Sequence, residues 1–259
     1  MCIRDRFNFA REISLDVIAI GKGKNNPFDV FKTPKDLEKE AKEKKMNPYM
    51  LTSFVDGSKT MIEMAALANY LDFDIDIDGM HGPNSTYDEL NSIFIPKTSG
   101  GILENTNVVD FAFGVAPGVF AIVYSEDDYV NYEMEYLKMG KGPYWTLYRP
   151  YHLTSLEIPR TIMKLMVEKE TQLSAKKWNV EVVAHSKKDL KAGTNLGSIG
   201  GENIYGKAMR VENSKNLAPL GIAENNILNS EVKKGEPIEI ENIDITDNQL
   251  YKYWLSQNT

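Results

Sequence analysis

A run rich in glycine and lysine follows an apolar stretch near the N-terminus, and its residue types suit the binding of an anion. Residues 13–20 read Ile-Ser-Leu-Asp-Val-Ile-Ala-Ile, and Gly21-Lys22-Gly23-Lys24-Asn25-Asn26-Pro27 follows. Ammonium and amide groups can hold a phosphate or carboxylate and polarise a carbonyl, while glycine lets the backbone approach closely. We expect Lys22 or Lys24 to stabilise an oxyanion and Asn25 and Asn26 to contact the ligand. A solvated turn is the alternative, because the spacing matches neither common phosphate-binding glycine motif.

A second candidate lies at the start of an expected helix. Lys59 and Glu63 are four residues apart and would share one helical face. They are the only charges on the apolar stretch 59–71, and a buried charge is costly unless it is paired or used. We interpret them as a proton-handling pair, with Asp56 and Ser58 as substrate contacts at the helix N-terminus. A plain buried ion pair, or a Lys59 exposed in the first helical turn, is the alternative.

Two further segments offer substrate contacts. His81 lies in the loop Gly79-Met80-His81-Gly82-Pro83, outside any apolar periodicity. Tyr148, Arg149 and His152 lie in an aromatic-rich segment, where an arginine can hold a phosphate with two parallel hydrogen bonds. An arginine packed on aromatic rings and a structural loop histidine are the alternatives.

No metal site is expected. Asp74-Ile75-Asp76-Ile77-Asp78-Gly79 matches the first half of a calcium-binding loop, but Ser85 stands where the twelfth-position glutamate belongs. The lone Cys2 excludes an internal disulfide and a cysteine-based zinc site. The spread of His81, His152 and His185 argues against a metal-dependent lyase.

The composition is that of an ordinary globular chain. Its 259 residues are 42% hydrophobic and 26% charged, with a net charge of −7. The negative charge argues against nucleic acid as a partner, and no apolar run approaches the roughly 20 residues of a membrane span. We therefore expect a cytoplasmic protein that binds neither nucleic acid nor membrane.

The expected elements change in character along the chain. A buried strand at 13–20 of the kind found in parallel sheets is followed by helices at 34–45 and 59–71, by strands at 92–95, 108–113 and 119–124, and by helices at 128–139 and 155–167. After residue 177 only short β-type runs remain, at 180–184, 195–199, 208–211 and 238–240. We expect a catalytic domain over 7–176, a small β domain over 177–245 and a tail over 246–259. Residues 1–6 are interpreted as an artefact or a frayed terminus.

Several segments together resemble one protein family. They are residues 18–27, 54–65, 79–83 and 147–153, with the turns at 189–193 and 232–237. The chain resembles the homoserine-dehydrogenase-like oxidoreductases that carry a C-terminal SAF domain, a group that includes deoxyxylulose-phosphate reductoisomerase-like enzymes. The resemblance implies an α+β catalytic domain with an open sheet, followed by a small all-β SAF-like (β-clip) domain.

The resemblance also implies an activity. Relatives bind NAD or NADP mainly through an N-terminal Rossmann domain, which this chain lacks and which we expect to precede residue 1. The implied reaction oxidises or reduces a small anionic polyol, phosphosugar or sugar acid, with a rearrangement in the reductoisomerase version. We expect a homodimer, formed through the sheet or its apolar strands, and a chain that is inactive by itself. The alternative is a non-catalytic SAF-containing module that binds a carbohydrate or a partner.

Overall fold

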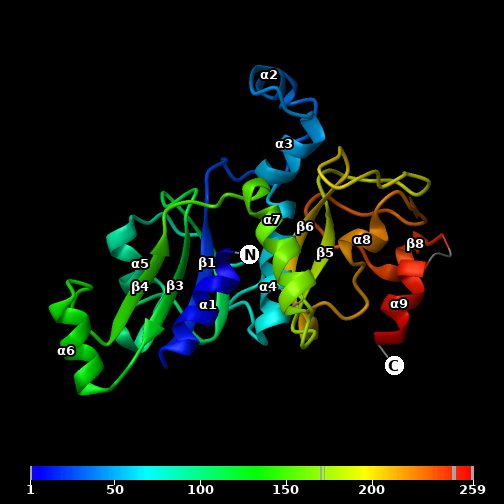
Figure 1. The fold of residues 1–259 in the computed structure, drawn as a ribbon. Coiled ribbons are helices and arrows are strands. Elements are labelled where there is room, and N and C mark those ends of the chain that lie inside the picture. The colour runs from blue at the N-terminus through cyan, green and yellow to red at the C-terminus, as the bar shows by residue number, and fades with distance from the viewer. Residues whose placement is uncertain (1, 170, 172, 247–248, 258–259) are drawn as a thin grey trace. The chain divides into compact units, whose positions relative to one another are not determined.

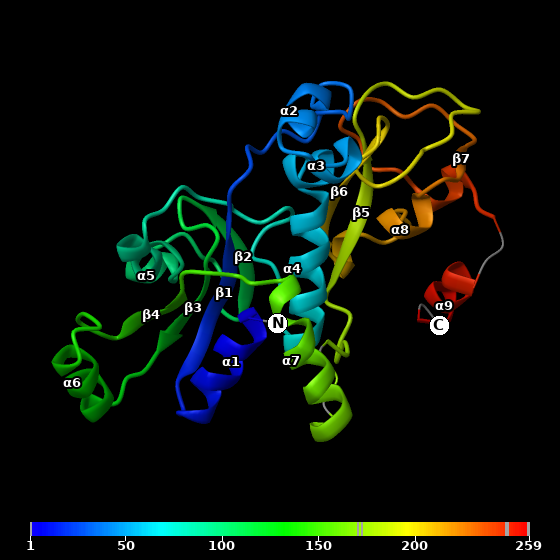
Figure 2. The same ribbon diagram turned by 45° about the horizontal axis from the view of Figure 1, so that its top comes forward.

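The computed structural model describes residues 2–169, 171, 173–246 and 249–257. The chain forms two compact units (Figures 1 and 2). The sheet unit comprises Met1–Asn25 and Ala66–Asn179, and the second unit comprises Asn26–Ala65 and Val180–Thr259. The chain therefore passes from one unit to the other three times: after Asn25, within helix α4 (Ser58–Leu71), and after Asn179, near the boundary expected at 177.

An open mixed sheet forms the core of the sheet unit, as expected of an α+β fold. Its order is β2-β1-β3-β4, with β1 parallel to β2 and antiparallel to β3. The strands are β1 (Asp16–Lys24), β2 (Val108–Phe113), β3 (Val119–Tyr124) and β4 (Tyr144–Arg149). The predicted bounds of β2 and β3 are confirmed.

The strand predicted at 13–20 lies instead at Asp16–Lys24, so the glycine- and lysine-rich run continues the strand. Gly21 pairs with Asp110 on one side and with Phe120 on the other. A Cβ at Gly21 would lie 2.0 Å from the Asp110 carbonyl oxygen, and one at Gly23 would lie 2.3 Å from the Ala116 nitrogen. The glycines thus permit close packing of backbone within a strand rather than a turn.

Helices cover parts of this sheet. Helix α1 (Cys2–Glu12) packs against β1 and β3 and buries Ile3 and Ala10, so residues 2–6 are helical and not frayed (Figure 2). The strand predicted at 92–95 is wrong, since Leu90–Ile93 is helix α5. The Thr86 amide and hydroxyl both donate to Glu89, in a capping box that starts this helical segment. The other helices here are α6 (Asp128–Tyr136) and α7 (Ile158–Met163).

The second unit combines helices with small sheets. Its helices are α2 (Glu38–Glu43), α3 (Pro48–Val55), the start of α4, α8 (Leu220–Ala223) and α9 (Gln249–Gln257). Its strands pair as β5 (Val180–Ser186) with β6 (Ile204–Arg210) and β7 (Ile227–Leu228) with β8 (Ile243–Asp244). Within the described residues the runs predicted at 195–199 and 238–240 form only isolated bridges. The all-β SAF-like domain stays a prediction.

Short 3₁₀ and π turns complete the two units. They are η1 (Tyr87–Glu89), η2 (Lys97–Ser99), η3 (Ser155–Glu157), η4 (Lys164–Glu168, a π turn), η5 (Val211–Asn213) and η6 (Ile240–Asn242).

The apolar strands that suggested a homodimer are covered within the chain. The first five residues of both β2 and β3 are buried. Exposed large apolar side chains lie elsewhere, and those of the sheet unit include several on α6 and along α7 and η4. The dimer stays a prediction, which the family resemblance also implies. Among the helices described, none has the length and apolar character needed to cross a membrane.

Candidate functional site

Three cations lie on one face of the sheet, toward the carboxyl end of β1. Lys22 pairs with Val119, which pairs with Arg149 on β4. Residues directly opposite one another share a face, and so do residues two apart on a strand, so Lys24 belongs to the same set. We call Lys22, Lys24 and Arg149 the cationic row. Lys24 is 6% exposed and Lys22 is half-buried.

Arg149 is held in place by two neighbours. Its Nη2 lies 2.5 Å from Glu157 Oε1, and its guanidinium carbon lies 4.5 Å from the centre of the Tyr151 ring. A guanidinium carries five N–H donors in a rigid fork, so an arginine oriented in this way can also bind an anion. Both sequence-based interpretations of Arg149, packing on a ring and anion binding, are compatible with this geometry.

Other predicted contacts do not join this row. Tyr148 points to the opposite face, where its hydroxyl donates to the Val115 carbonyl at 2.8 Å and its ring packs against Tyr87. Asn25 is exposed just after β1, and Asn26 begins the second unit. His152 is half-buried beyond the end of β4.

His81 lies between two carboxylates whose side chains are 0% exposed. Its Nδ1 is 3.0 Å from Asp110 Oδ2 and its Nε2 is 3.4 Å from Asp76 Oδ2. Asp110 also accepts the backbone N–H groups of His81 and Gly82, both at 3.1 Å. Asp76 accepts the N–H groups of Glu104 and Asn105, at 3.0 and 2.8 Å. The imidazole therefore fixes the loop that contains it (residues 79–83) to β2, the edge strand of the sheet.

The two carboxylates favour the charged form of this histidine. The hydrogen bond with Asp110 is the largest cause that raises the pKa of His81, and burial opposes it. Asp110 precedes Phe111, the residue opposite Lys22, so its side chain leaves the sheet on the face away from the cationic row. His81 is thus a half-buried link between two buried carboxylates and does not belong to the cationic row.

In the second unit, Asp56 and Ser58 are buried and used by the chain itself. The Ser58 hydroxyl accepts the Gly206 N–H at 2.8 Å, and Asp56 Oδ1 accepts the Ser58 N–H at 2.9 Å. Lys187 Nζ lies 2.8 Å from Asp56 Oδ2, and the two side chains are 1% and 0% exposed. These contacts hold the unit together, which gives Asp56 and Ser58 a structural role instead of a place open to substrate.

Lys187 was not singled out from the sequence. Its ammonium also donates to the carbonyls of Lys32 at 2.7 Å and Gly201 at 2.9 Å, in addition to its ion pair with Asp56. Burial lowers the pKa of Lys187, and Asp56 opposes this effect. The pair is separated by more than a hundred residues, so no local pattern reveals it.

Lys59 is exposed, and it is not a buried charge. Its ammonium lies 4.4 Å from the centre of the Phe54 ring and 3.9 Å from Met50 Sδ. Ile62 on the same helix is 39% exposed. One side of α4 is therefore exposed to solvent, although its apolar composition predicted a buried helix. Glu63 is half-buried. Lys24 and Lys59 belong to different units.

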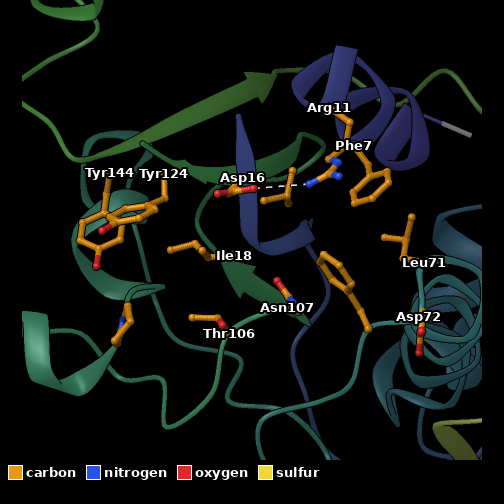
Figure 3. A pocket seen from close by; sticks show the side chains of 13 residues that line it. Phe7, Arg11, Asp16, Ile18, Leu71, Asp72, Thr106, Asn107, Tyr124 and Tyr144 are labelled. Atoms are coloured by element: carbon orange, nitrogen blue, oxygen red, sulfur yellow. Dashed lines mark hydrogen bonds and ion pairs between the residues drawn. The ribbon is translucent and has the colours of Figure 1, made fainter. Parts of the chain in front are cut away.

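An open pocket of about 680 Å³ lies at the other end of the sheet (Figure 3). Residues from the start of β1, including Asp16 and Ile18, line it together with α1 and Tyr124 and Tyr144. It contains none of the site residues predicted from the sequence. The cationic row is the candidate site, because the carboxyl ends of strands are where α/β sheets bind reacting ligands and because the cations gather there.

The sheet, its helical cover and the cationic row define an α+β domain equipped to bind an anion. The model of one protein family, described as "Oxidoreductase DRL, catalytic domain", matches residues 2–158, more than half of the chain. The chain belongs to this family and is an oxidoreductase. A search of curated proteins found no match.

Proposed function

We propose that this oxidoreductase acts on a small anionic polyol, a phosphosugar or a sugar acid, held by the cationic row. The observation that carries the proposal is the placement of Lys22, Lys24 and Arg149 on one face at one end of the sheet. Adjacent strands are about 4.8 Å apart, so Lys22 and Arg149 lie about 10 Å apart at the backbone. Their long side chains can reach two ends of one small anion.

The chemistry follows from the two kinds of cation. Arg149 would grip a phosphate or carboxylate through its fork of N–H donors. A lysine ammonium, from Lys22 or Lys24, would polarise the reacting carbonyl and stabilise negative charge on its oxygen. Burial of Lys24 strengthens such an interaction, because the low local dielectric weakens screening.

The proposal includes NAD or NADP as the cofactor that carries hydride. The described residues do not form a site for a dinucleotide. Gly21 and Gly23 lie inside a strand paired on both sides, not in a turn that opens a helix. The N-terminus of α4 is occupied by the Asp56 carboxylate.

The finer assignments extend this proposal. We propose that the chain is a homoserine-dehydrogenase-like oxidoreductase with a SAF-like C-terminal part. We also propose that it is a cytoplasmic homodimer. Lys59 and Glu63 would handle protons, and Asn25, Asn26 and His152 would add substrate contacts.

Binding of glycerol 3-phosphate and of gluconate tests the cationic row. By titration calorimetry we expect Lys22→Met and Arg149→Met each to weaken binding about tenfold, because each removes a charge-assisted contact. Lys141→Met, which removes an exposed lysine on a loop, is the matched control and should leave affinity unchanged. Equal affinities in all four proteins would contradict the proposal.

Tests with glucose and with NADPH separate an oxidoreductase that holds an anionic substrate from a carbohydrate-binding module. The cationic row predicts that gluconate binds more tightly than uncharged glucose, whereas a carbohydrate-binding module would not need the carboxylate. We expect the 259-residue chain neither to oxidise gluconate with NADP or NAD nor to reduce glucose with NADPH or NADH, because its described residues offer no dinucleotide site. Robust oxidation would overturn this expectation, and a preference for glucose would favour the binding module.

A further inference from the structure

The open pocket at the amino end of β1 has no place in the proposed reaction, and we propose that it binds an uncharged heteroaromatic ring of the purine type. Its volume of about 680 Å³ lies within the range of small-molecule sites. Aromatic rings stand on two sides of it, with an amide side chain between them (Figure 3).

The first aromatic wall is a fixed pair of tyrosines. The Tyr124 and Tyr144 rings lie 5.0 Å apart between centres, inclined by 32°. The Tyr124 hydroxyl donates to Glu126, and the Tyr144 hydroxyl is 3.1 Å from Ser99 Oγ. The hydrogen bond to Glu126 raises the pKa of Tyr124 to about 12, so this ring stays a neutral phenol. Both hydroxyls are engaged by the chain itself, which leaves the ring faces for stacking.

The second wall is formed by Phe7 of α1 and Phe73, which follows α4. Their rings meet edge to face, with centres 5.6 Å apart and planes at 86°. Figure 3 shows Phe7 across the pocket from the two tyrosines. A flat ring bound between such walls gains stacking contacts that are tolerant of its exact substituents.

Asn107 supplies a hydrogen-bonding edge between the walls. It is exposed, and its side-chain amide makes no hydrogen bond within the part of the chain that the structure describes. Its backbone φ of 59° is left-handed, and its carbonyl accepts the Asp74 N–H at 3.0 Å, so the residue is held by its backbone. An asparagine amide pairs with the N6 donor and the N7 acceptor of an adenine ring.

The charges around the pocket favour an uncharged ligand. Arg11 is 3.4 Å from Asp16, and Asp72 is 3.4 Å from Lys177. Each cation at the rim is therefore balanced by a carboxylate, and Glu126 adds a negative charge behind Tyr124. A phosphate would find no surplus positive charge here, in contrast to the cationic row.

Adenosine and 7-deazaadenosine, which lacks the N7 acceptor, test the pocket by titration calorimetry on the whole chain. We expect adenosine to bind about tenfold more tightly than the deaza compound. In Asn107→Gly, which keeps the left-handed backbone without strain, both should bind equally. Tyr144→Leu should weaken both about tenfold, because a stacking face is lost. The control Tyr129→Leu, at an exposed tyrosine of α6 outside the pocket, should change neither.

Each of the following results would overturn the proposal. Absence of saturable adenosine binding would remove the site. The same preference for adenosine in the wild type and in Asn107→Gly would remove the amide contact, and equal losses in Tyr144→Leu and Tyr129→Leu would remove the stacking wall. Phe7→Leu tests the opposite wall if the circular dichroism spectrum shows that Tyr144→Leu does not fold.

Discussion

Replacement of Lys187 by methionine is expected to lower the free energy of unfolding by about 3–5 kcal/mol, because it leaves a buried carboxylate without its counter-ion. The Asp56 side chain is 0% exposed and lies 2.8 Å from the lysine ammonium. The variant also loses the hydrogen bonds to the Lys32 and Gly201 carbonyls. Urea unfolding followed by circular dichroism measures the difference.

The neighbouring lysine provides the control. Lys188 is exposed, so Lys188→Met should change the free energy of unfolding by about 0.5 kcal/mol or less. Asp56→Asn combined with Lys187→Met should be less destabilised than the sum of the two single variants, because the double variant leaves no buried charge. A cost for Lys187→Met that matches Lys188→Met would show that the ion pair is not a stabilising connection of the second unit.

Local patterns were sufficient for elements whose signal is contained in their own residues. The apolar runs at 108–113 and 119–124 form strands with the predicted bounds, and the helix expected at 59–71 is α4. Helix α3 had such a signal too, although it was missed. Asn47 caps it by accepting the Tyr49 N–H at 2.8 Å, and Pro48 occupies the first position.

Other features depend on residues far apart in the sequence. Gly21 and Gly23 resemble a turn until the strands on both sides are known. The four-residue spacing of Lys59 and Glu63 suggested a buried pair, yet Lys59 is exposed and the buried pair is Asp56 with Lys187. The face shared by Lys22 and Arg149 follows from the order of strands β1, β3 and β4, which a lysine-rich run cannot reveal.

For His81 the sequence predicts the local setting but not the residues that it contacts. Its position between glycines correctly separated it from apolar periodicity, but its partners Asp76 and Asp110 lie on other segments. Asp76 stands in the run that matches half of a calcium-binding loop, and its side chain is instead 0% exposed and lies beside His81. The fold places this loop histidine between two buried carboxylates, and the hydrogen bond with Asp110 raises its pKa.

Replacement of His81 by glutamine is expected to remove both stability and its pH dependence. A charged hydrogen bond contributes about 2–3 kcal/mol, so His81→Gln should lose about that much at pH 6. In the wild type the folded-state pKa of His81 is raised above its ordinary value of 6.5. The contribution is therefore complete below pH 6.5 and declines as the pH rises through the folded-state pKa. The variant should lack this decline.

Proton NMR titration of the His81 ring measures the cause directly. The hydrogen bond with Asp110 is the largest influence that raises the pKa of His81, so Asp110→Asn should lower the midpoint toward 6.5. Asp88→Asn removes an exposed carboxylate on the segment that follows the loop and serves as the control. A midpoint that is the same in the wild type and in Asp110→Asn would assign the shift to another group. Urea unfolding at pH 6 and pH 8.5 then relates the titration to stability, and because His81 lies on the face away from the cationic row, binding of gluconate should be unchanged in His81→Gln where the variant is folded.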